Sequence, residues 1–173
     1  MKVPPARADS FAAAPPGDIR AILIYGPDLG LVRERAEAAA IAVAGSLSDP
    51  FNTVEFTPAA LKDEPSRLTD EACALSMMGG RRVVRLRDAT DGVTGAATDA
   101  LASNGEALVI IEAGDLNPRS KLRALFEKAD GAAAIACYMD EGPGLDDLVR
   151  KTLGDAGMTA DRDVVSWIAG NLG

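Results

Sequence analysis

Histidine is absent from this 173-residue sequence, and cysteine occurs only twice, as Cys73 and Cys137. The two cysteines lie far apart and form no Cys-x-x-Cys pair, so these residues offer neither the ligand spacing of a zinc site nor a Cys-His nucleophile. The lack of histidine also excludes a Ser-His-Asp triad within them. Two cysteines in apolar surroundings are typical of proteins in the reducing cytosol, and we expect a cytoplasmic location.

Long apolar runs are missing as well. None approaches the ~20 residues that a membrane-spanning helix needs, and the proline-broken N-terminus has no apolar core of a signal peptide. We therefore expect no membrane partner. Aromatic residues make up only 4% of the chain although hydrophobic residues make up 47%, which is typical of a globular protein packed with small side chains. A net charge of −8 disfavours direct binding of a nucleic acid backbone.

Short apolar segments alternate with amphipathic ones along most of the chain. The pattern predicts strands at 20–25, 52–57, 82–88, 106–113 and 132–139. It predicts helices between them at 29–45, 66–78, 94–103 and 118–130. This alternation calls for an α/β fold with a five-stranded, mostly parallel sheet and helices on both faces. Because strand 106–113 is the most apolar, we place it inside the sheet.

Composition divides the chain into three parts. Residues 1–18 are rich in proline and are interpreted as an N-terminal arm with one short helical turn near Ser10 and Phe11. Residues 19–140 hold the α/β pattern. From 141 to 173 the pattern becomes purely helical, with two amphipathic segments. We interpret this last part as the start of a small helical domain.

The first predicted strand is followed by a glycine-containing loop and a helix, the arrangement that many nucleotide-binding proteins use to hold a phosphate. A phosphate loop requires G-x-x-x-x-G-K-[ST], but counting from Gly26 its last three positions hold Leu31, Val32 and Arg33. No lysine reaches the phosphates, no hydroxyl binds magnesium, and Asp28 places a negative charge beside them. We therefore expect no nucleotide cofactor and no catalysis by this chain. Since Arg33 could supply a cation, a nucleotide-dependent enzyme or switch with an atypical loop is the alternative.

Acidic residues at strand ends form a second group of candidates. Asp28 and Asp88 could mimic part of the acidic pocket of a phospho-receiver domain, but no lysine follows the fifth strand to complete it. We interpret Glu112, Asp115 and Asp140 as solvated loop carboxylates rather than metal ligands. No catalytic residue and no metal site is assigned.

Four segments, taken in order and spacing, resemble one family. They are ILIYGPDLGLVRERA, ALSMMGGRRVVRLRDA, ALVIIEAGDLNPRSKLRALFEKA and AIACYMDE. Together they are similar to the delta subunit of the bacterial DNA polymerase III clamp loader, over about residues 15–173. The resemblance implies a P-loop-type, AAA+-like fold with a degenerate phosphate loop, followed by a helical lid. It also implies that the chain is an N-terminal fragment, with a helical collar domain beyond it.

The resemblance implies a non-catalytic role in DNA replication. The delta subunit binds the sliding clamp, which is the beta subunit, and helps to open the ring for loading onto primed DNA. In the full-length protein the clamp-loader ATPase subunits and delta-prime would be further partners. DNA would be contacted only through the assembled complex, and polymerase activity belongs to the holoenzyme.

The resemblance also places the clamp contact at the end of the helix before the third strand, where the family carries S-[LM]-F-[AGS]. The matching residues here are Ser76, Met77, Met78 and Gly79, with Met78 in place of the usual aromatic residue. Arg81 is a further candidate for the clamp-binding site. Arg81 and Arg82 could meet an acidic clamp surface or could simply be solvated.

Helical periodicity bears on the same segment. With Leu68 at the centre of the core-facing stripe of helix 66–78, Ala72 and Leu75 lie on that stripe. Met77 then falls about 180° away and Met78 lies at the edge of the stripe. This phase predicts an apolar plug that fits a pocket of a partner. In the alternative, the helix ends before Met77 and both methionines fold back into the core.

Overall fold

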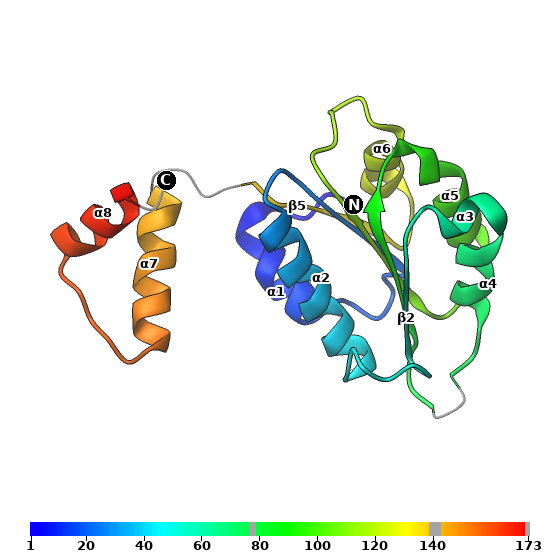
Figure 1. The fold of residues 1–173 in the computed structure, drawn as a ribbon, viewed down its shortest axis with the longest axis horizontal. Helices are drawn as coiled ribbons and strands as arrows, with labels where there is room; N and C mark the ends of the chain where they lie inside the picture. Colours follow the sequence, from blue (N-terminus) through cyan, green and yellow to red (C-terminus); the bar gives the residue numbers. More distant parts are fainter. Residues whose placement is uncertain (77–78, 139–142, 172–173) are drawn as a thin grey trace. The chain divides into compact units, whose positions relative to one another are not determined.

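The computed structural model describes residues 1–76, 79–138 and 143–171. Contacts within the chain separate it into two compact units, Met1–Cys137 and Tyr138–Gly173 (Figure 1). The first unit includes the N-terminal arm together with the α/β pattern.

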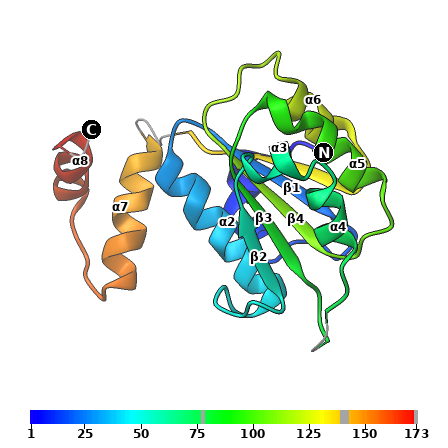
Figure 2. The ribbon, with the colours of Figure 1, turned by 45° about the vertical axis from the view of Figure 1, so that its right-hand side comes forward.

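The first unit is built on a sheet of five strands in the order β2-β3-β4-β1-β5 (Figure 2). The strands are β1 (Ala21–Tyr25), β2 (Thr53–Phe56), β3 (Val83–Ala89), β4 (Leu108–Ala113) and β5 (Ala132–Ala136). Every neighbouring pair is parallel. The predicted α/β class, the parallel sheet and the inner position of β4 are confirmed.

Helices cover both faces of this sheet, as right-handed crossovers require. The chain passes from β1 to the edge strand β2 through α2 (Leu29–Ala44) and then returns across the sheet in the opposite direction. The returning connections therefore lie on the other face (Figure 2). They contain α3 (Ala60–Asp63), α4 (Arg67–Cys73), the 3₁₀ helix η2 (Asp91–Val93), α5 (Thr94–Ala102) and α6 (Lys121–Lys128).

Two apolar layers result, because side chains alternate between the faces of a strand. Leu23 and Ile111 belong to the layer under α4, α5 and α6. Ile22 and Ile110 belong to the layer under α2. The predicted core stripe of α2 is confirmed, since it buries Val32, Ala36, Ala39 and Ala40. Its three alanines are small, so the helix axis can lie close to the sheet.

The N-terminal arm closes one edge of the sheet. Its helical turn is α1 (Ala8–Ala13), which confirms the turn expected near Ser10, and the 3₁₀ helix η1 (Pro5–Arg7) precedes it. The sequence did not indicate that Lys2 pairs in parallel with Ala134 of β5. The Val3 amide donates to the Ala134 carbonyl at 2.9 Å. The arm thus covers an edge that would otherwise present unpaired backbone groups.

The helix predicted over 66–78 is wrong beyond Cys73. Helix α4 ends there, and Ala74 is extended with φ −68° and ψ 131°. The Ala72 carbonyl accepts from the Ala107 amide at 3.3 Å, just before β4. A Cβ on Gly105 would lie 2.4 Å from that same carbonyl oxygen. The approach to β4 therefore occupies the carbonyl that another helical turn would use.

The early end of α4 changes the interpretation of the residues after it. Leu75, predicted on the core-facing stripe, is 78% exposed. The helical phase that set Met77 opposite Leu68 does not apply, because the helix stops before it. Met77 and Met78 themselves lie outside the described residues.

The second unit contains two helices, as the sequence predicted. They are α7 (Pro143–Asp155) and α8 (Arg162–Asn171), and they pack through Val149, Val165 and Ala169. In the part of the chain that the structure describes, no helix is both long enough and apolar enough to span a membrane.

Candidate functional site

The loop after β1 carries a carboxylate at the start of α2. Asp28 is the N-cap of this helix, and its Oδ1 accepts from the Leu31 amide at 2.9 Å. A helix N-terminus in this position is a natural site for a phosphate, because its free amides point outward. Here an acidic side chain of the same chain already bonds one of those amides.

Gly26 in this loop is needed for packing. A Cβ at this position would lie 1.8 Å from the carbonyl oxygen of Cys137. The Cys137 amide in turn donates to the Tyr25 carbonyl at 2.7 Å. The segment leaving β5 therefore passes directly against the end of β1, and only glycine fits there. From the sequence, Gly26 had been interpreted as the first glycine of a phosphate-loop-like segment.

A buried ion pair lies between α2 and the sheet. Arg85 of β3 donates to Glu112 Oε1 of β4 through Nε at 3.0 Å and through Nη2 at 2.6 Å. Their side chains are only 5% and 6% exposed. Burial raises the pKa of Glu112, and the Arg85 guanidinium opposes that rise. The interpretation of Glu112 as a solvated carboxylate is therefore wrong.

Two further charges extend this pair toward the sheet edge. Glu55 of β2 contacts Arg85 at 3.1 Å and Arg87 at 3.0 Å. Arg87 and Glu112 line a hollow of about 340 Å³ together with Gly30 and Arg33 of α2. Glu55 and Glu112 are thus both paired with arginines.

The other acidic candidates supply no metal centre. Asp115 is exposed, as expected, and Asp88, which lines the same hollow, has a positive φ of 55°. Asp140 lies outside the described residues. Among residues 1–76, 79–138 and 143–171, no group of three or more acidic, histidine or cysteine side chains is placed to hold a metal ion.

The segment predicted to bind the clamp follows α4 as a turn. Ser76 Oγ lies 2.6 Å from Asn52 Oδ1 and 2.8 Å from the Gly79 carbonyl oxygen. Gly79 and Gly80 have φ values of 81° and 85°. These angles favour glycine, because a side chain would clash with the backbone. Ser76 and Gly79 are thus joined on the two sides of Met77 and Met78, which lie outside the described residues.

Arg81 and Arg82 are held by the chain instead of standing free in solvent. Arg81 donates from Nε to the Glu106 carbonyl at 2.8 Å and from Nη2 to the Ile19 carbonyl at 2.6 Å. Burial lowers the pKa of the Arg81 guanidinium below its ordinary value. Arg82 Nη2 bonds Glu71 Oε2 at 3.0 Å. Both side chains are thus partly buried and hydrogen-bonded within the chain, and their contact with an acidic clamp surface stays a prediction.

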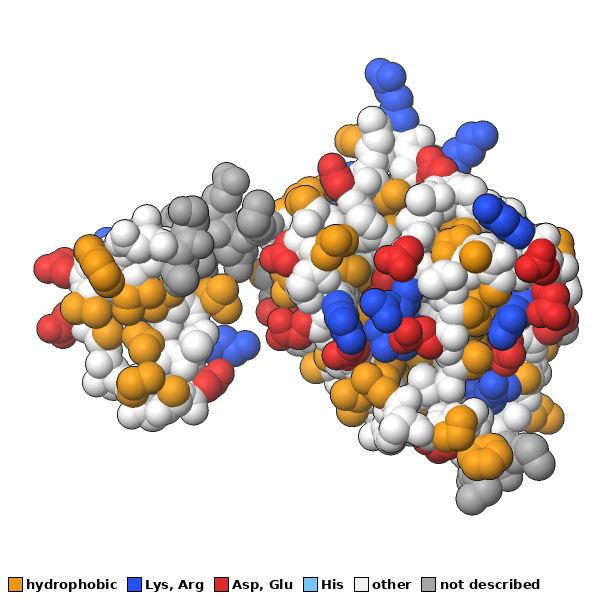
Figure 3. Space-filling model, in the orientation of Figure 1, with side chains coloured by type: hydrophobic (Ala, Val, Ile, Leu, Met, Phe, Trp, Pro, Cys, Tyr) orange, Lys and Arg blue, Asp and Glu red, His pale blue; other side chains and the backbone are white. Residues whose placement is uncertain are grey.

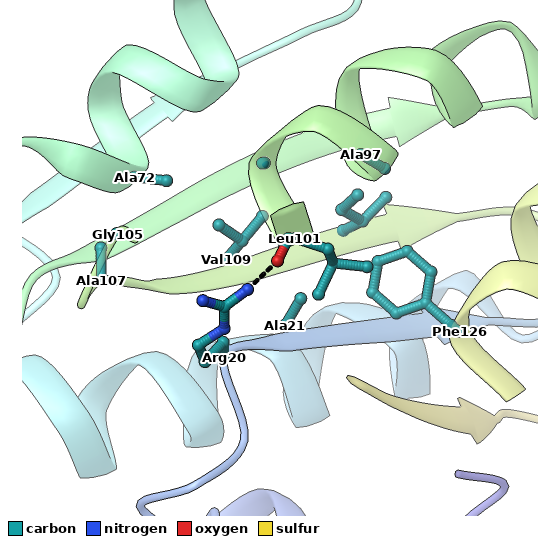
Figure 4. A pocket seen from close by; sticks show the side chains of 11 residues that line it. Arg20, Ala21, Ala72, Ala97, Leu101, Gly105, Ala107, Val109 and Phe126 are labelled. Atoms are coloured by element: carbon teal, nitrogen blue, oxygen red, sulfur yellow. Dashed lines mark hydrogen bonds between the residues drawn. The ribbon is translucent and has the colours of Figure 1, made fainter. Parts of the chain in front are cut away.

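Arg20, which the sequence analysis did not single out, completes this region. Its Nη1 donates to the Ser103 carbonyl at 2.7 Å and its Nη2 bonds the Leu101 carbonyl, so it caps the end of α5 (Figure 4). Its inner side lines a small cavity of about 10 Å³ beside Phe126. Arg20 stands directly before β1 and Arg82 directly before β3. Because parallel strands begin at the same edge of a sheet, these positions could have indicated from the sequence that the two arginines lie near each other.

One open hollow unites these residues. It has a volume of about 530 Å³, and we call it the arginine hollow. Its lining includes Arg20, Leu75, Ser76, Arg81, Arg82 and Glu106. Of the predicted clamp-binding residues, the structure places Ser76 and Arg81 in its wall.

The strand order and the two helical layers define a parallel α/β fold with helices on both faces of the sheet. This fold is similar to that of the Bacillus subtilis DNA clamp loader delta protein, with a TM-score of 0.64 and 16% identity over 84% of this chain and 46% of that one. A DNA polymerase III gamma subunit-related protein from Thermotoga maritima gives a TM-score of 0.48 and 17% identity, over 81% of this chain and 47% of that one.

The present chain therefore spans less than half the length of either protein. No family model and no curated protein sequence matches it. The fold implied by the resemblance to the delta subunit is confirmed.

Proposed function

We propose that this chain belongs to a non-catalytic clamp-loader subunit, which binds the sliding clamp and helps to open the ring during DNA replication in the cytoplasm. The observation that carries the proposal is the fold, which is similar over 84% of the chain to a clamp loader delta protein. The Asp28 cap on α2 supports the non-catalytic part, because a carboxylate stands at the helix end where a nucleotide phosphate would bind. In the complete subunit, the loader ATPase subunits and delta-prime would be further partners.

We place the clamp contact on the turn after α4. Because the helix ends at Cys73, the next residues leave it in an extended direction, and Leu75 is 78% exposed. An exposed leucine two residues before a methionine pair gives a short apolar segment of the kind that anchors in a partner's pocket. Ser76 and Gly79 support this segment from both sides, and Arg81 fixes its exit to the sheet.

The test is clamp binding by the Met77→Ala, Met78→Ala double variant. Truncating an anchor side chain typically costs ~2 kcal/mol or more of binding free energy. We expect the dissociation constant for the sliding clamp of the same source to rise roughly thirtyfold or more, since ~1.4 kcal/mol is tenfold. Met77→Asp should abolish binding, because its carboxylate would be desolvated without a partner.

Arg33→Ala is the matched control. Arg33 is exposed on α2, and its ion pair among the described residues is with Glu37 in the next turn, at 2.9 Å. We expect it to leave clamp affinity unchanged. Variants of Met77 and Met78 that unfold the chain would show that these side chains belong to the core. Folded variants that bind the clamp normally would place the contact elsewhere.

A nucleotide-dependent enzyme or switch is the second candidate. The observation that favours it is the hollow of about 340 Å³ beside Gly30 and Arg33. It lies at the carboxyl ends of β3 and β4, where open α/β sheets generally bind their ligands. A rise in Tm with millimolar Mg-ATP would favour this second candidate over the clamp-loader subunit.

A further inference from the structure

We infer that the arginine hollow receives a carboxylate of the protein surface on which the turn after α4 docks. The inference rests on the proposed function, because it takes that surface to be the sliding clamp. It assigns to this face a polar contact, separate from the apolar contact of Leu75, Met77 and Met78.

The first reason is uncompensated charge. Within the described residues, Arg20 bonds only to the carbonyls of Leu101 and Ser103, and Arg81 only to those of Ile19 and Glu106. Within the described ranges, neither guanidinium has a carboxylate oxygen within 4.0 Å. Carbonyls satisfy hydrogen bonds but carry no net charge. The two cations therefore have no ion-pair partner among the described residues and still attract an incoming anion.

The second reason is that donors are left over. A guanidinium has five N–H groups. Arg81 uses Nε and Nη2 in its two bonds, and Arg82 bonds Glu71 through Nη2. The Nη1 groups of both arginines make no hydrogen bond with the described part of the chain. A carboxylate that reaches them gains charge-assisted hydrogen bonds, which are stronger than neutral ones.

The third reason concerns the kind of anion. Leu75, 78% exposed, lines the hollow beside the arginines, so an apolar and a cationic contact adjoin. That combination suits a folded protein surface with an acidic side chain next to an apolar pocket. A nucleic acid backbone needs a continuous basic track. The chain has a net charge of −8, and on the face seen in Figure 3 acidic and basic side chains are interspersed.

Glu106 gives a test that does not depend on weakening the fold. It is exposed, it lines the hollow, and its carboxylate forms no hydrogen bond or ion pair with the described residues. Its negative charge opposes an incoming carboxylate. Glu106→Lys should therefore speed association with the clamp about three- to tenfold at low salt, and this gain should shrink at high salt. Stopped-flow or surface plasmon resonance measures it.

Two more variants sharpen the result. Glu34→Lys makes the same charge change on an exposed position of α2, on the other face of the sheet, and should leave the association rate near that of the unmodified chain. Arg82→Gln should slow association and speed dissociation, and thermal melting shows whether that variant is folded. If Glu106→Lys and Glu34→Lys act alike, the gain comes from net charge and the inference is wrong.

The remaining outcomes separate this inference from the proposed function. An unmodified chain that does not bind the clamp at all overturns both. Clamp binding that depends on Met77 and Met78 but is indifferent to Glu106→Lys and Arg82→Gln overturns only the inference. A Glu106→Lys variant that gains affinity for a DNA oligonucleotide and not for the clamp also overturns it, since the anion is then a phosphate.

Discussion

The Asp28 carboxylate and the Leu31 amide form an N-cap of 2.9 Å at the point where this fold would otherwise present helix amides to a phosphate. In the same loop, Gly26 lies against the carbonyl of Cys137. Gly26, which gives the loop its nucleotide-binding outline, and Asp28, which departs from that outline, thus both have structural roles. The loop keeps the shape of a phosphate site while its groups bond to the protein itself.

Mg-ATP should leave the stability of the chain unchanged. A ligand present at 100 times its dissociation constant stabilises a protein by ~2.7 kcal/mol, which a melting experiment detects easily. We expect no shift in Tm at millimolar Mg-ATP, because Leu31, Val32 and Arg33 replace the residues that hold nucleotide and magnesium. A clear rise in Tm would favour the nucleotide-dependent enzyme or switch.

Asp28→Ala should destabilise the first unit by about 1 kcal/mol, the usual cost of removing an N-cap side chain. Urea denaturation followed by circular dichroism measures the change. Asp28→Asn retains an oxygen that can accept from the Leu31 amide, so it should cost less than the alanine variant. Equal losses of unfolding free energy in the two variants would show that Asp28 does not stabilise the chain through its hydrogen bond to the Leu31 amide.

Breaking the Arg85–Glu112 pair should cost much more than removing it altogether. Arg85→Met alone leaves the buried Glu112 carboxylate without its partner, and such losses run to about 3–5 kcal/mol of unfolding free energy. Glu112→Leu alone should cost less, because Arg85 keeps its ion pair with Glu55 at 3.1 Å. The double change Arg85→Met, Glu112→Leu should recover a large part of this loss. A double-mutant cycle in urea checks it. Additive single losses would show that the two residues do not act as a pair.

The stability of the chain should depend on Asp91 in acid. Asp91 accepts from the Ser120 hydroxyl and from the Leu122 amide at 3.0 Å, and these hydrogen bonds lower its pKa below the ordinary 3.8. Because the folded pKa is the lower one, this contribution is complete above pH 3.8 and is lost as the pH falls through the folded pKa.

The measurement compares urea denaturation of the unmodified chain and of Asp91→Asn across this acid range. We expect the stability difference between them to shrink as the pH falls. Asp99→Asn is the matched control, since Asp99 is exposed on α5 and its carboxylate makes no hydrogen bond with the residues that the structure describes. A constant difference for Asp91→Asn would contradict the prediction.

The local pattern of apolar and polar residues was sufficient to predict the strands, most of the helices and the α/β class of this fold. The spacing of apolar residues that are close in sequence indicates whether a segment is a strand or a helix. Val32, Ala36 and Ala39 could therefore be assigned to the core from spacing alone. Counting along the motif from Gly26 was enough to show that Val32 and Arg33 stand where a phosphate loop has lysine and serine or threonine. The prediction of the clamp-binding turn at Ser76 and Gly79 stays a prediction, because its central residues are outside the described ranges.

Contacts between distant residues decided the rest. The end of α4 depends on the Ala107 amide reaching Ala72, across 35 residues of sequence. The burial of Glu112 depends on Arg85 of a neighbouring strand, and the arginine hollow exists only because the amino ends of β1, β3 and β4 meet at one edge. Periodicity within a segment carries no information about such partners, since the partner is chosen by how the strands are ordered. The sequence by itself therefore determined most of the elements and the departure from the phosphate-loop motif, whereas the tertiary structure alone decided where α4 stops and which charges are paired.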